Sequence, residues 1–482
     1  MSQVGTFAPN VVGNRLQEDS FMAIDRRTLL RLGSLAGASL MLPAQASTPS
    51  PERAGRLLIR NATVITMDPA LGDMNNTDVL IEHDTIRQIG KGLVASQAQV
   101  IDATDMILIP GLIDTHWHLW NSLLRNSAPV PGGPAFFVTQ QATSKRFTPA
   151  LTELSIRLGL AEATHAGITT VNSWAHNIRD PDFAQAELRA LSSSGLRARL
   201  WYGYAQDLPA TGAMDFKDIE RVQSQLKTPA HRRIDLGLAI RGPERTEAPI
   251  WEAEFAFAKA HGLPVSTHIA VSRQMQEKKA IQQLAGRGLL SSSVQLVHAT
   301  HADEQDLASI AQAGATVCIT PLTEMRVGYG LPPVAALHRA KLPITLGIDT
   351  LVLGGNANPF MLMQTCLNLA IGTSGDEQLM TAKDVLHWAT QGAALAMGIG
   401  QETGSITVGK RADLALIDTR RLGIFPVNDP VACIVQSATP ADVDTVIADG
   451  RIVKRGGQLI GIDTATLRSQ ALAAARHLLQ QG

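Results

Sequence analysis

Residues 107–118 read ILIPGLIDTHWH, an apolar run that ends in two histidines two positions apart. Alternation along a strand places His116 and His118 on the same face, directed into the same space. Seven further apolar strand patterns follow, separated by amphipathic helical patterns such as residues 151–165, 251–261 and 304–313; the strands are expected at residues 167–174, 198–204, 234–241, 264–268, 294–298, 316–320 and 344–349. Eight strands in repeated strand–helix order predict an α/β fold, a parallel (β/α)8 barrel of the TIM type.

The two flanks of this region carry short β-type runs separated by Gly, Asn and Asp turn signals. We therefore expect a barrel over residues 111–400, inserted in a small β-sandwich domain that residues 51–110 and 401–482 build together. A helical pattern closes the chain at residues 464–480. The flanking strands are expected at residues 57–67, 78–89, 99–109, 404–408, 413–417, 443–448 and 451–454.

Composition limits the function classes. The 482 residues include 42 Lys+Arg and 43 Asp+Glu without a basic run, which argues against a nucleic-acid footprint, and 45% of them are hydrophobic, which argues against disorder. The cysteines Cys318, Cys366 and Cys433 are too few and too far apart for a disulfide framework or a cysteine-based zinc site. Any metal must be held by histidine and carboxylate, and the expected partner is a small-molecule substrate.

The N-terminal region, residues 1–50, has the pattern of a signal peptide and a linker. The stretch DRRTLLR at residues 25–31 places a twin arginine before an apolar run at residues 32–42, and a small-x-small pattern follows at Ala44 and Ala46. It resembles a Tat signal, which implies export of the folded protein to the periplasm with cleavage after Ala46. The run is far shorter than the roughly 20 residues that span a bilayer, so no stable membrane anchor is expected. Translation is expected to begin at Met22.

Three more metal-compatible side chains come at predicted strand ends, namely His268, His298 and Asp349. The carboxyl ends of barrel strands ring one mouth of the barrel, where they would meet His116 and His118. Independent core histidines have no reason to converge in this way, so the pattern indicates a metal-dependent site.

These motifs resemble those of the amidohydrolase superfamily, in particular its cytosine deaminase-like branch, which includes the ATZ/TRZ chlorohydrolases and guanine deaminases. The resemblance covers residues 56–456, and it includes the PGLIDTHxH strand, the strand-end residues and the returning segment GSIxxGKxADL at residues 404–414. It implies that one divalent metal ion is held by His116, His118, His268 and Asp349. It also implies that His298 lies beside the attacking water or the substrate.

The chemistry of these residue types agrees with that implication. Imidazole and carboxylate ligands that leave one position open suit Zn²⁺, with Fe²⁺ or Mn²⁺ as alternatives, and such an ion lowers the pKa of bound water to about 7. Asp349 would accept the proton of the water and pass it to a leaving group, while His298 would polarise a C=N or C=O bond. A single ion is expected, because residues 235–241 contain no lysine for a bridging carbamate.

One position departs from the family pattern. Many deaminases of this branch carry a proton-shuttling glutamate three residues after the histidine of the fifth strand, and here that position is Val271. Either another acid replaces it or the leaving group needs less help than an amine. The best substitute in the sequence is Glu324, on the loop after the seventh strand, although Glu324 could instead pair with Arg326.

Four residues at the predicted mouth are candidates for substrate binding. Trp120 would stack on a planar ring, His176 follows the second strand, Arg241 ends the fourth strand and His301 follows His298 by three positions. Each has an ordinary structural alternative: loop packing for Trp120 and His176, a salt bridge for Arg241, and a place at a helix start for His301.

We expect a metal-dependent hydrolase that acts on a non-peptide C–N bond, with deamination of an N-heterocycle as the leading reaction. The alternative is hydrolysis of an amide, carbamate or halide at the same mononuclear site. An alternative of another class is a catalytically inactive binding or scaffold protein. The family resemblance is compatible with a homo-oligomer, and the Tat machinery is the expected partner of the precursor. Substrate identity depends on loop geometry that residue spacing does not give.

Overall fold

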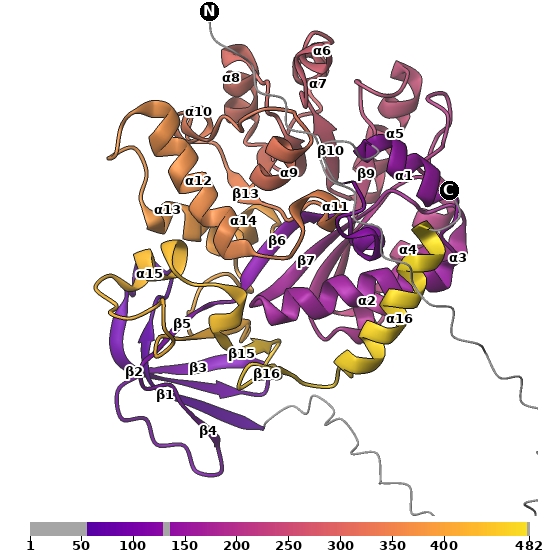
Figure 1. The fold of residues 1–482 in the computed structure, drawn as a ribbon. Helices are drawn as coiled ribbons and strands as arrows, with labels where there is room; N and C mark the ends of the chain where they lie inside the picture. Colours follow the sequence, from indigo (N-terminus) through magenta and orange to yellow (C-terminus); the bar gives the residue numbers. More distant parts are fainter. Residues whose placement is uncertain (1–54, 129–134, 480–482) are drawn as a thin grey trace, which may run out of the picture. The chain divides into compact units, whose positions relative to one another are not determined.

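The computed structural model describes residues 55–128 and 135–479, so the predicted signal peptide lies outside the described residues. Eight parallel strands form one sheet in which spatial order follows sequence order, as the strand count predicted (Figure 1). These strands are β6 (Leu112–Trp117), β7 (Ile168–Ala175), β8 (Arg197–Tyr202), β9 (Ile234–Ile240), β10 (Val265–Ile269), β11 (Val294–His298), β12 (Thr316–Ile319) and β13 (Ile344–Leu346).

The barrel closes where the last strand meets the first. The Asp349 N–H donates to the His116 carbonyl at 2.8 Å, and the His118 N–H donates to the Asp349 carbonyl at 2.6 Å. These two hydrogen bonds form a parallel bridge between Trp117 and Asp349 just beyond the end of β13. The backbone of three candidate metal ligands therefore closes the barrel.

Helices follow the barrel strands and cover their outer side (Figure 1). Local signals fix their ends: Thr148 and Asp180 cap the N-termini of α2 and α3, each followed by proline, and Asp303 with Asp306 forms a capping box at α8. The helices of this region are α1 (Phe136–Ser144), α2 (Pro149–His165), α3 (Pro181–Ser193), α4 (Phe216–Leu226), α5 (Ala248–His261), α6 (Arg273–Gln276), α7 (Ala280–Gly286), α8 (Glu304–Ala313), α9 (Pro321–Arg326), α10 (Val334–Arg339), α11 (Leu351–Gly354), α12 (Pro359–Ser374), α13 (Ala382–Trp388) and α14 (Gln391–Ala396), with 3₁₀ turns η2 (Leu119–Leu124) and η3 (Pro229–His231).

The two flanks form a second, mixed sheet of nine strands that is continuous in its hydrogen bonding. Antiparallel pairing of β14 with β5, with Leu416 opposite Leu108, joins the C-terminal flank to the N-terminal one. The strands are β1 (Arg56–Val64), β2 (Met74–Glu82), β3 (Thr85–Gly90), β4 (Gln99–Asp102), β5 (Met106–Pro110), β14 (Leu414–Asp418), β15 (Val443–Ala448), β16 (Arg451–Arg455) and β17 (Gln458–Leu459); α15 (Pro430–Gln436), η4 (Pro440–Asp442) and α16 (Thr464–Leu479) complete the flank.

Three of the predicted flanking strands differ from the structure. Residues 404–408 are not a strand: Gly404 and Gly409 have φ angles of +91° and +94°, and Ile406 is buried as part of a loop, which explains the apolar pattern. Residues 78–89 divide into β2 and β3, because the chain reverses tightly after Glu82, where His83 has a φ of +58°. Residues 99–109 likewise divide into β4 and β5.

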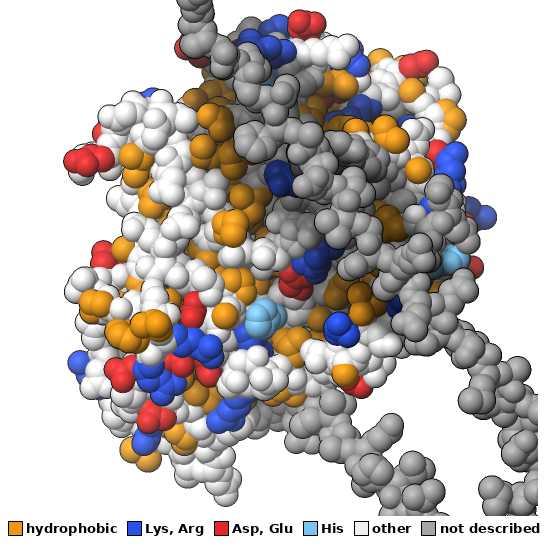
Figure 2. All heavy atoms as spheres, viewed as in Figure 1, with side chains coloured by type: hydrophobic (Ala, Val, Ile, Leu, Met, Phe, Trp, Pro, Cys, Tyr) orange, Lys and Arg blue, Asp and Glu red, His pale blue; other side chains and the backbone are white. Residues whose placement is uncertain are grey.

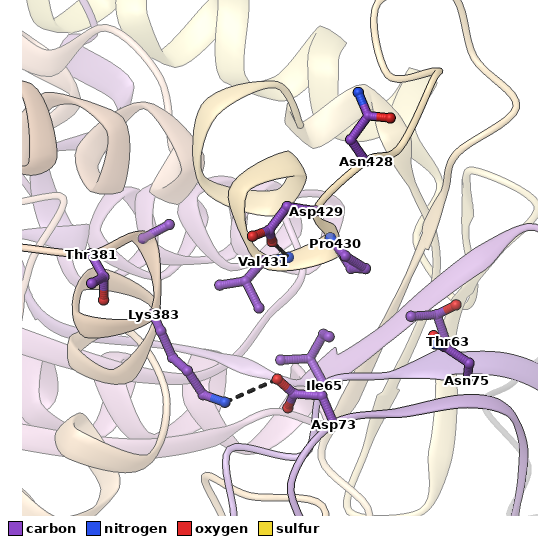
Figure 3. Close-up of a pocket in the computed structure, with 11 residues that line it drawn as sticks. Thr63, Ile65, Asp73, Asn75, Thr381, Lys383, Asn428, Asp429, Pro430 and Val431 are labelled. Atoms are coloured by element: carbon purple, nitrogen blue, oxygen red, sulfur yellow. Dashed lines mark hydrogen bonds and ion pairs between the residues drawn. The ribbon is translucent and has the colours of Figure 1, made fainter.

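The flank sheet also meets the helices of the barrel region. A cleft of about 450 Å³ opens between the β1–β2 region and the starts of α13 and α15. Figure 3 shows Lys383 reaching across it to Asp73, with Nζ and Oδ2 2.9 Å apart. The residues that line this cleft include none of the candidate site residues, so the cleft is separate from the barrel mouth.

The surface matches the near-neutral composition. Figure 2 shows side chains of both charges lying close together over the flank sheet, with apolar side chains scattered among them. Within the described residues, no helix combines the length and the apolar character that a bilayer crossing requires.

Candidate functional site

Four of the predicted residues converge at the barrel mouth. His116 and His118 come from the end of β6, His268 from β10 and Asp349 from the position after β13, and one ligand atom of each lies within 4.8 Å of the others. The Nε2 atoms of His116 and His118 lie 3.3 and 3.2 Å from Asp349 Oδ1. His268 Nε2 lies 3.2 Å from His116 Nε2. The strand-end argument therefore predicted the cluster correctly.

These spacings fit a divalent metal ion. Ligands that bind an ion tetrahedrally at about 2.0–2.1 Å lie about 3.3–3.4 Å from one another, close to the separations observed here. His118 Nδ1 lies 3.1 Å from the Trp174 carbonyl oxygen, which only accepts, so Nδ1 carries the proton and Nε2 keeps its lone pair for a ligand bond. The donor set and its orientation fit a metal centre that His116, His118, His268 and Asp349 would hold.

The protonation states favour the same use. Burial lowers the pKa of His116 to about 3 and also lowers the pKa of His268, so both imidazoles are neutral near pH 7. Burial acts to raise the pKa of Asp349, but the neighbouring side chains of His116 and His118 outweigh that effect and hold the pKa well below its ordinary value. The mouth therefore presents the neutral imidazoles of His116 and His268 beside one carboxylate.

The backbone at these strand ends adopts conformations that non-glycine residues rarely take. His298 and Asp349 have φ angles of 75° and 63°, and Ala270 and Ala299 have φ angles of 50°. Each such residue costs on the order of 1 kcal/mol or more and persists only where the surrounding structure enforces it. These residues lie at or within three residues of the ends of β10, β11 and β13.

Asp114 supports the backbone of the segments that carry the ligand candidates. The sequence patterns assigned no role to this residue. Its Oδ2 accepts from the Ile348 N–H at 2.6 Å and its Oδ1 from the His116 N–H at 3.2 Å, so one buried carboxyl group holds β6 against the segment that carries Asp349. Burial raises the pKa of Asp114 well above its ordinary value. The sequence signal that could have indicated this role is the aspartate that follows the apolar residues at the start of β6.

Glu324 lies next to His298. Its Oε1 is 3.1 Å from His298 Nδ1 and accepts from the Thr320 N–H at 2.9 Å, and both side chains are buried. The described contacts of Glu324 run to His298 and Thr320 and do not include Arg326, which was the structural alternative. This arrangement orients His298 and leaves its Nε2 as the ring nitrogen available to a substrate. A proton-shuttling role for Glu324 stays a prediction.

Two of the substrate-binding candidates lie against the metal ligands. The His176 ring centroid is 4.2 Å from that of His118, and Trp120 donates from Nε1 to His176 Nδ1 at 3.1 Å. Trp174, whose ring centroid is 4.2 Å from that of His268, completes an aromatic wall on this side of the mouth.

The other two candidates are engaged in structural contacts. Arg241 donates to the carbonyl oxygens of Leu208 and Pro209 at 2.8 and 2.7 Å and to that of Gly212, and its guanidinium lies 5.0 Å from the Tyr204 ring centroid. The contacts of Arg241 therefore favour a structural role, although with backbone carbonyls rather than in the salt bridge that was the alternative. His301 donates from Nε2 to the Tyr329 carbonyl at 2.7 Å, a contact that holds the loop after α9 near His298.

Comparison with protein families identifies the family of this chain. The amidohydrolase family model matches residues 107–453, which include both ends of the barrel and all four ligand candidates. The chain belongs to the amidohydrolase family. This amidohydrolase is a hydrolase, and the four residues that converge at its barrel mouth fit a divalent metal site.

Curated relatives agree with this membership, and solved structures share the fold. The chain is 28% identical over 438 residues to 5'-deoxyadenosine deaminase of Methanosarcina acetivorans, covering 88% of this chain and 98% of that protein. It is 27% identical over 444 residues to 5-methylthioadenosine/S-adenosylhomocysteine deaminase of Acetivibrio thermocellus, covering 88% and 100%. The fold matches an adenosine deaminase from Xanthomonas campestris with bound zinc, with a TM-score of 0.80, 24% identity and coverage of 89% and 100%. It also matches atrazine chlorohydrolase from Arthrobacter aurescens complexed with zinc, with a TM-score of 0.76, 20% identity and coverage of 87% and 100%.

Proposed function

We propose that this amidohydrolase is a zinc-dependent deaminase that removes the exocyclic amino group of an adenine-bearing nucleoside. The observation that carries the proposal is the convergence of three imidazoles and one carboxylate at a buried mouth, with His298 held beside them by Glu324. The relatives named for deamination of 5'-deoxyadenosine and 5-methylthioadenosine support the choice of substrate class. That deamination is itself the hydrolysis of a non-peptide C–N bond.

Each side chain of the site has a separate role in the proposed reaction. His116, His118, His268 and Asp349 would hold a divalent ion, which would acidify a water molecule at neutral pH. The Asp349 carboxylate takes a proton from the attacking water and delivers it to the departing amino nitrogen. His298, held at Nδ1 by Glu324, would polarise through Nε2 the C=N bond that is attacked, and the rings of Trp174 and Trp120 would exclude bulk water from one side.

Ammonia release tests the proposal. The purified, zinc-loaded protein is incubated with adenosine, 5'-deoxyadenosine, 5-methylthioadenosine and S-adenosylhomocysteine, and the ammonia formed is measured with the Asp349→Asn variant as the blank. We expect release from at least one nucleoside by the wild type and none by the variant. Absence of ammonia from every nucleoside would refute deamination of this substrate class.

A different leaving group on the same site is the second candidate, and Val271 is the observation that favours it. Its buried alkyl side chain occupies the position where many deaminases of this branch carry a proton-shuttling glutamate, and valine transfers no proton. Turnover of a chlorinated heterocycle, an amide or a carbamate without ammonia from any amine would favour this candidate. A protein that binds no metal and turns over none of these compounds would be an inactive scaffold.

The N-terminal pattern supports a further proposal on location. We infer that a Tat signal directs the protein to the periplasm, since the twin arginine at residues 26–27 precedes a short apolar run and a small-x-small site at Ala44 and Ala46. N-terminal sequencing of the mature protein from a periplasmic fraction tests cleavage after Ala46, and sequencing of the precursor tests the start at Met22. Sedimentation of the purified protein tests the proposed homo-oligomer.

A further inference from the structure

Glu244 is a buried carboxylic residue to which neither the sequence motifs nor the metal cluster gives a role. It lies four residues after β9, in the segment RGPER at residues 241–245, and its exposed fraction is 3%. Loops that follow barrel strands form the functional mouth of this fold. Burying a carboxyl group away from water costs free energy. A functional role would explain why the protein keeps one in such a loop.

The carboxyl group of Glu244 reaches the end of the fifth barrel strand. Its Oε1 accepts from the Ala270 N–H at 2.6 Å, and Ala270 lies between the ligand His268 and Val271. The carboxyl therefore lies beside the position where many deaminases of this branch carry their proton-shuttling glutamate. Its Oε2 is buried and has no hydrogen-bond partner among the described residues.

The charges around Glu244 connect it with the site. Burial raises its pKa above the ordinary value of 4.5, against the opposing effects of the Ala270 hydrogen bond, Arg245, Lys278 and His298. Burial also raises the pKa of Tyr329, to about 12, and the negative charge of Glu244 contributes to that rise. His298 and Tyr329, the two groups that share these charge effects with Glu244, have rings 5.4 Å apart at the mouth.

The other buried glutamates are less well placed for this task. Glu324 has its Oε1 committed to His298 Nδ1 and the Thr320 N–H. Glu187 lies on α3 and accepts from the Ser173 hydroxyl at 2.9 Å, and Glu254 lies on α5. Among the buried glutamates in the described part of the chain, Glu244 is the one hydrogen-bonded to the segment that follows His268.

We propose, on the basis of the deaminase function above, that Glu244 is the proton-transfer carboxylate that replaces the missing glutamate at position 271. Its Oε2 takes one proton as an O–H bond of the attacking water breaks and the C–O bond forms. It returns that proton to the ring nitrogen next to the attacked carbon. The second proton of the water passes through Asp349 to the amino nitrogen, the C–N bond breaks, and ammonia leaves with the lactam product.

Glu244→Gln tests this role with little change of shape. The amide oxygen of glutamine still accepts from the Ala270 N–H, so a purely structural role survives the substitution, whereas the proton carrier is lost. We expect kcat for the nucleoside that releases ammonia to fall about 10²–10⁴-fold, with KM changed less than about threefold and zinc content unchanged. The matched control is Glu187→Gln, another buried glutamate with a raised pKa, which should keep kcat within about threefold.

Binding to the zinc-loaded protein gives a readout that does not depend on turnover. The lactam product carries an N–H that would donate to Glu244 Oε2, so titration calorimetry should show product affinity falling at least about tenfold in Glu244→Gln. A 1-deaza analogue of the substrate, with C–H in place of that ring nitrogen, should bind both proteins equally.

A kcat of Glu244→Gln close to that of the wild type would overturn the assignment. So would affinities for the product and for the 1-deaza analogue that fall together, or that both stay unchanged. Failure of the proposed function is distinct from this outcome, because it would show first as a wild-type protein that releases no ammonia.

Discussion

Substitution of Gly347 by alanine tests how closely the site depends on packing between the last and first barrel strands. Gly347 follows β13, and a Cβ atom there would lie 2.7 Å from the His116 carbonyl oxygen, 2.9 Å from His116 Cβ and 3.2 Å from Cys318 Sγ. The two contacts with His116 are so short that one neighbour must move. The His116 carbonyl also accepts the closing hydrogen bond from the Asp349 N–H, so the displacement acts on two metal ligands at once.

The expected size of the effect follows from overpacking in a rigid core. Adding a methyl group to a filled site costs about 1–3 kcal/mol of folding free energy. If about half of the upper value, about 1.5 kcal/mol, is lost from the free energy of zinc binding, zinc affinity falls about tenfold, since about 1.4 kcal/mol corresponds to a factor of ten. Gly347→Ala should therefore both unfold more easily and bind zinc more weakly than the wild type.

Urea unfolding and competitive zinc titration with a chromophoric chelator measure the two effects. Gly372→Ala is the matched control, because Gly372 lies within α12 and a methyl group added there would have no neighbouring atom within 4 Å. Alanine there should leave zinc affinity unchanged and stabilise the helix by up to about 1 kcal/mol. Equal zinc affinity and equal stability in Gly347→Ala and the wild type would refute the claim that this close approach sets the ligand geometry.

Further predictions concern the metal, His298, a buried glutamate and export. Removal of the metal by a chelator should abolish hydrolysis and lower the unfolding temperature, with both restored by added zinc; an equally active apoprotein would contradict this. Glu324→Gln should lower kcat about 10–100-fold at unchanged zinc content, because His298 Nδ1 loses a charged partner, and steady-state kinetics showing an unaltered kcat would argue against that role. Burial raises the pKa of Glu187 from the ordinary 4.5 to about 8, so the folded state keeps a proton that the unfolded state loses, and stability should fall as pH rises across that interval. Glu187→Gln should flatten this fall in urea unfolding between about pH 5 and 8, and the same slope in both proteins would show that another group is responsible. Replacement of Arg26 and Arg27 by lysine should hold the precursor in the cytoplasmic fraction of a Tat-competent host, whereas undiminished periplasmic delivery would exclude this signal.

The convergence of these side chains could be predicted from sequence because it follows from the barrel, whereas their assignment as metal ligands came from the family resemblance. His116, His268 and Asp349 come at or directly after the ends of apolar strands, and a parallel barrel brings all strand ends of one polarity to one mouth. The prediction needed only the order of strands and the residue types at their ends. The exact lengths of the strands did not affect it.

The partners of the remaining side chains could not be predicted, because they depend on the paths of loops. The contact of Glu324 with His298 requires α9 to begin at Pro321 directly after β12, and the carbonyl contacts of Arg241 require the path of residues 208–212. Glu244 was missed for the same reason, since its hydrogen bond to Ala270 joins residues 26 positions apart across two loops. Residues 404–408 were misassigned because burial of Ile406 in a loop produces the same apolar signal as a strand.

The hydrogen bonds between His116, His118 and Asp349 have a consequence for the order of assembly. They join segments separated by more than 230 residues, so the ligand set becomes complete only after the last strand has docked on the first. A chain in which those strands have not met would hold imidazoles without their carboxylate and would bind an ion weakly. An ion held by the full set would therefore bind tightly only to the closed barrel, and it would stabilise the junction between the first and last strands.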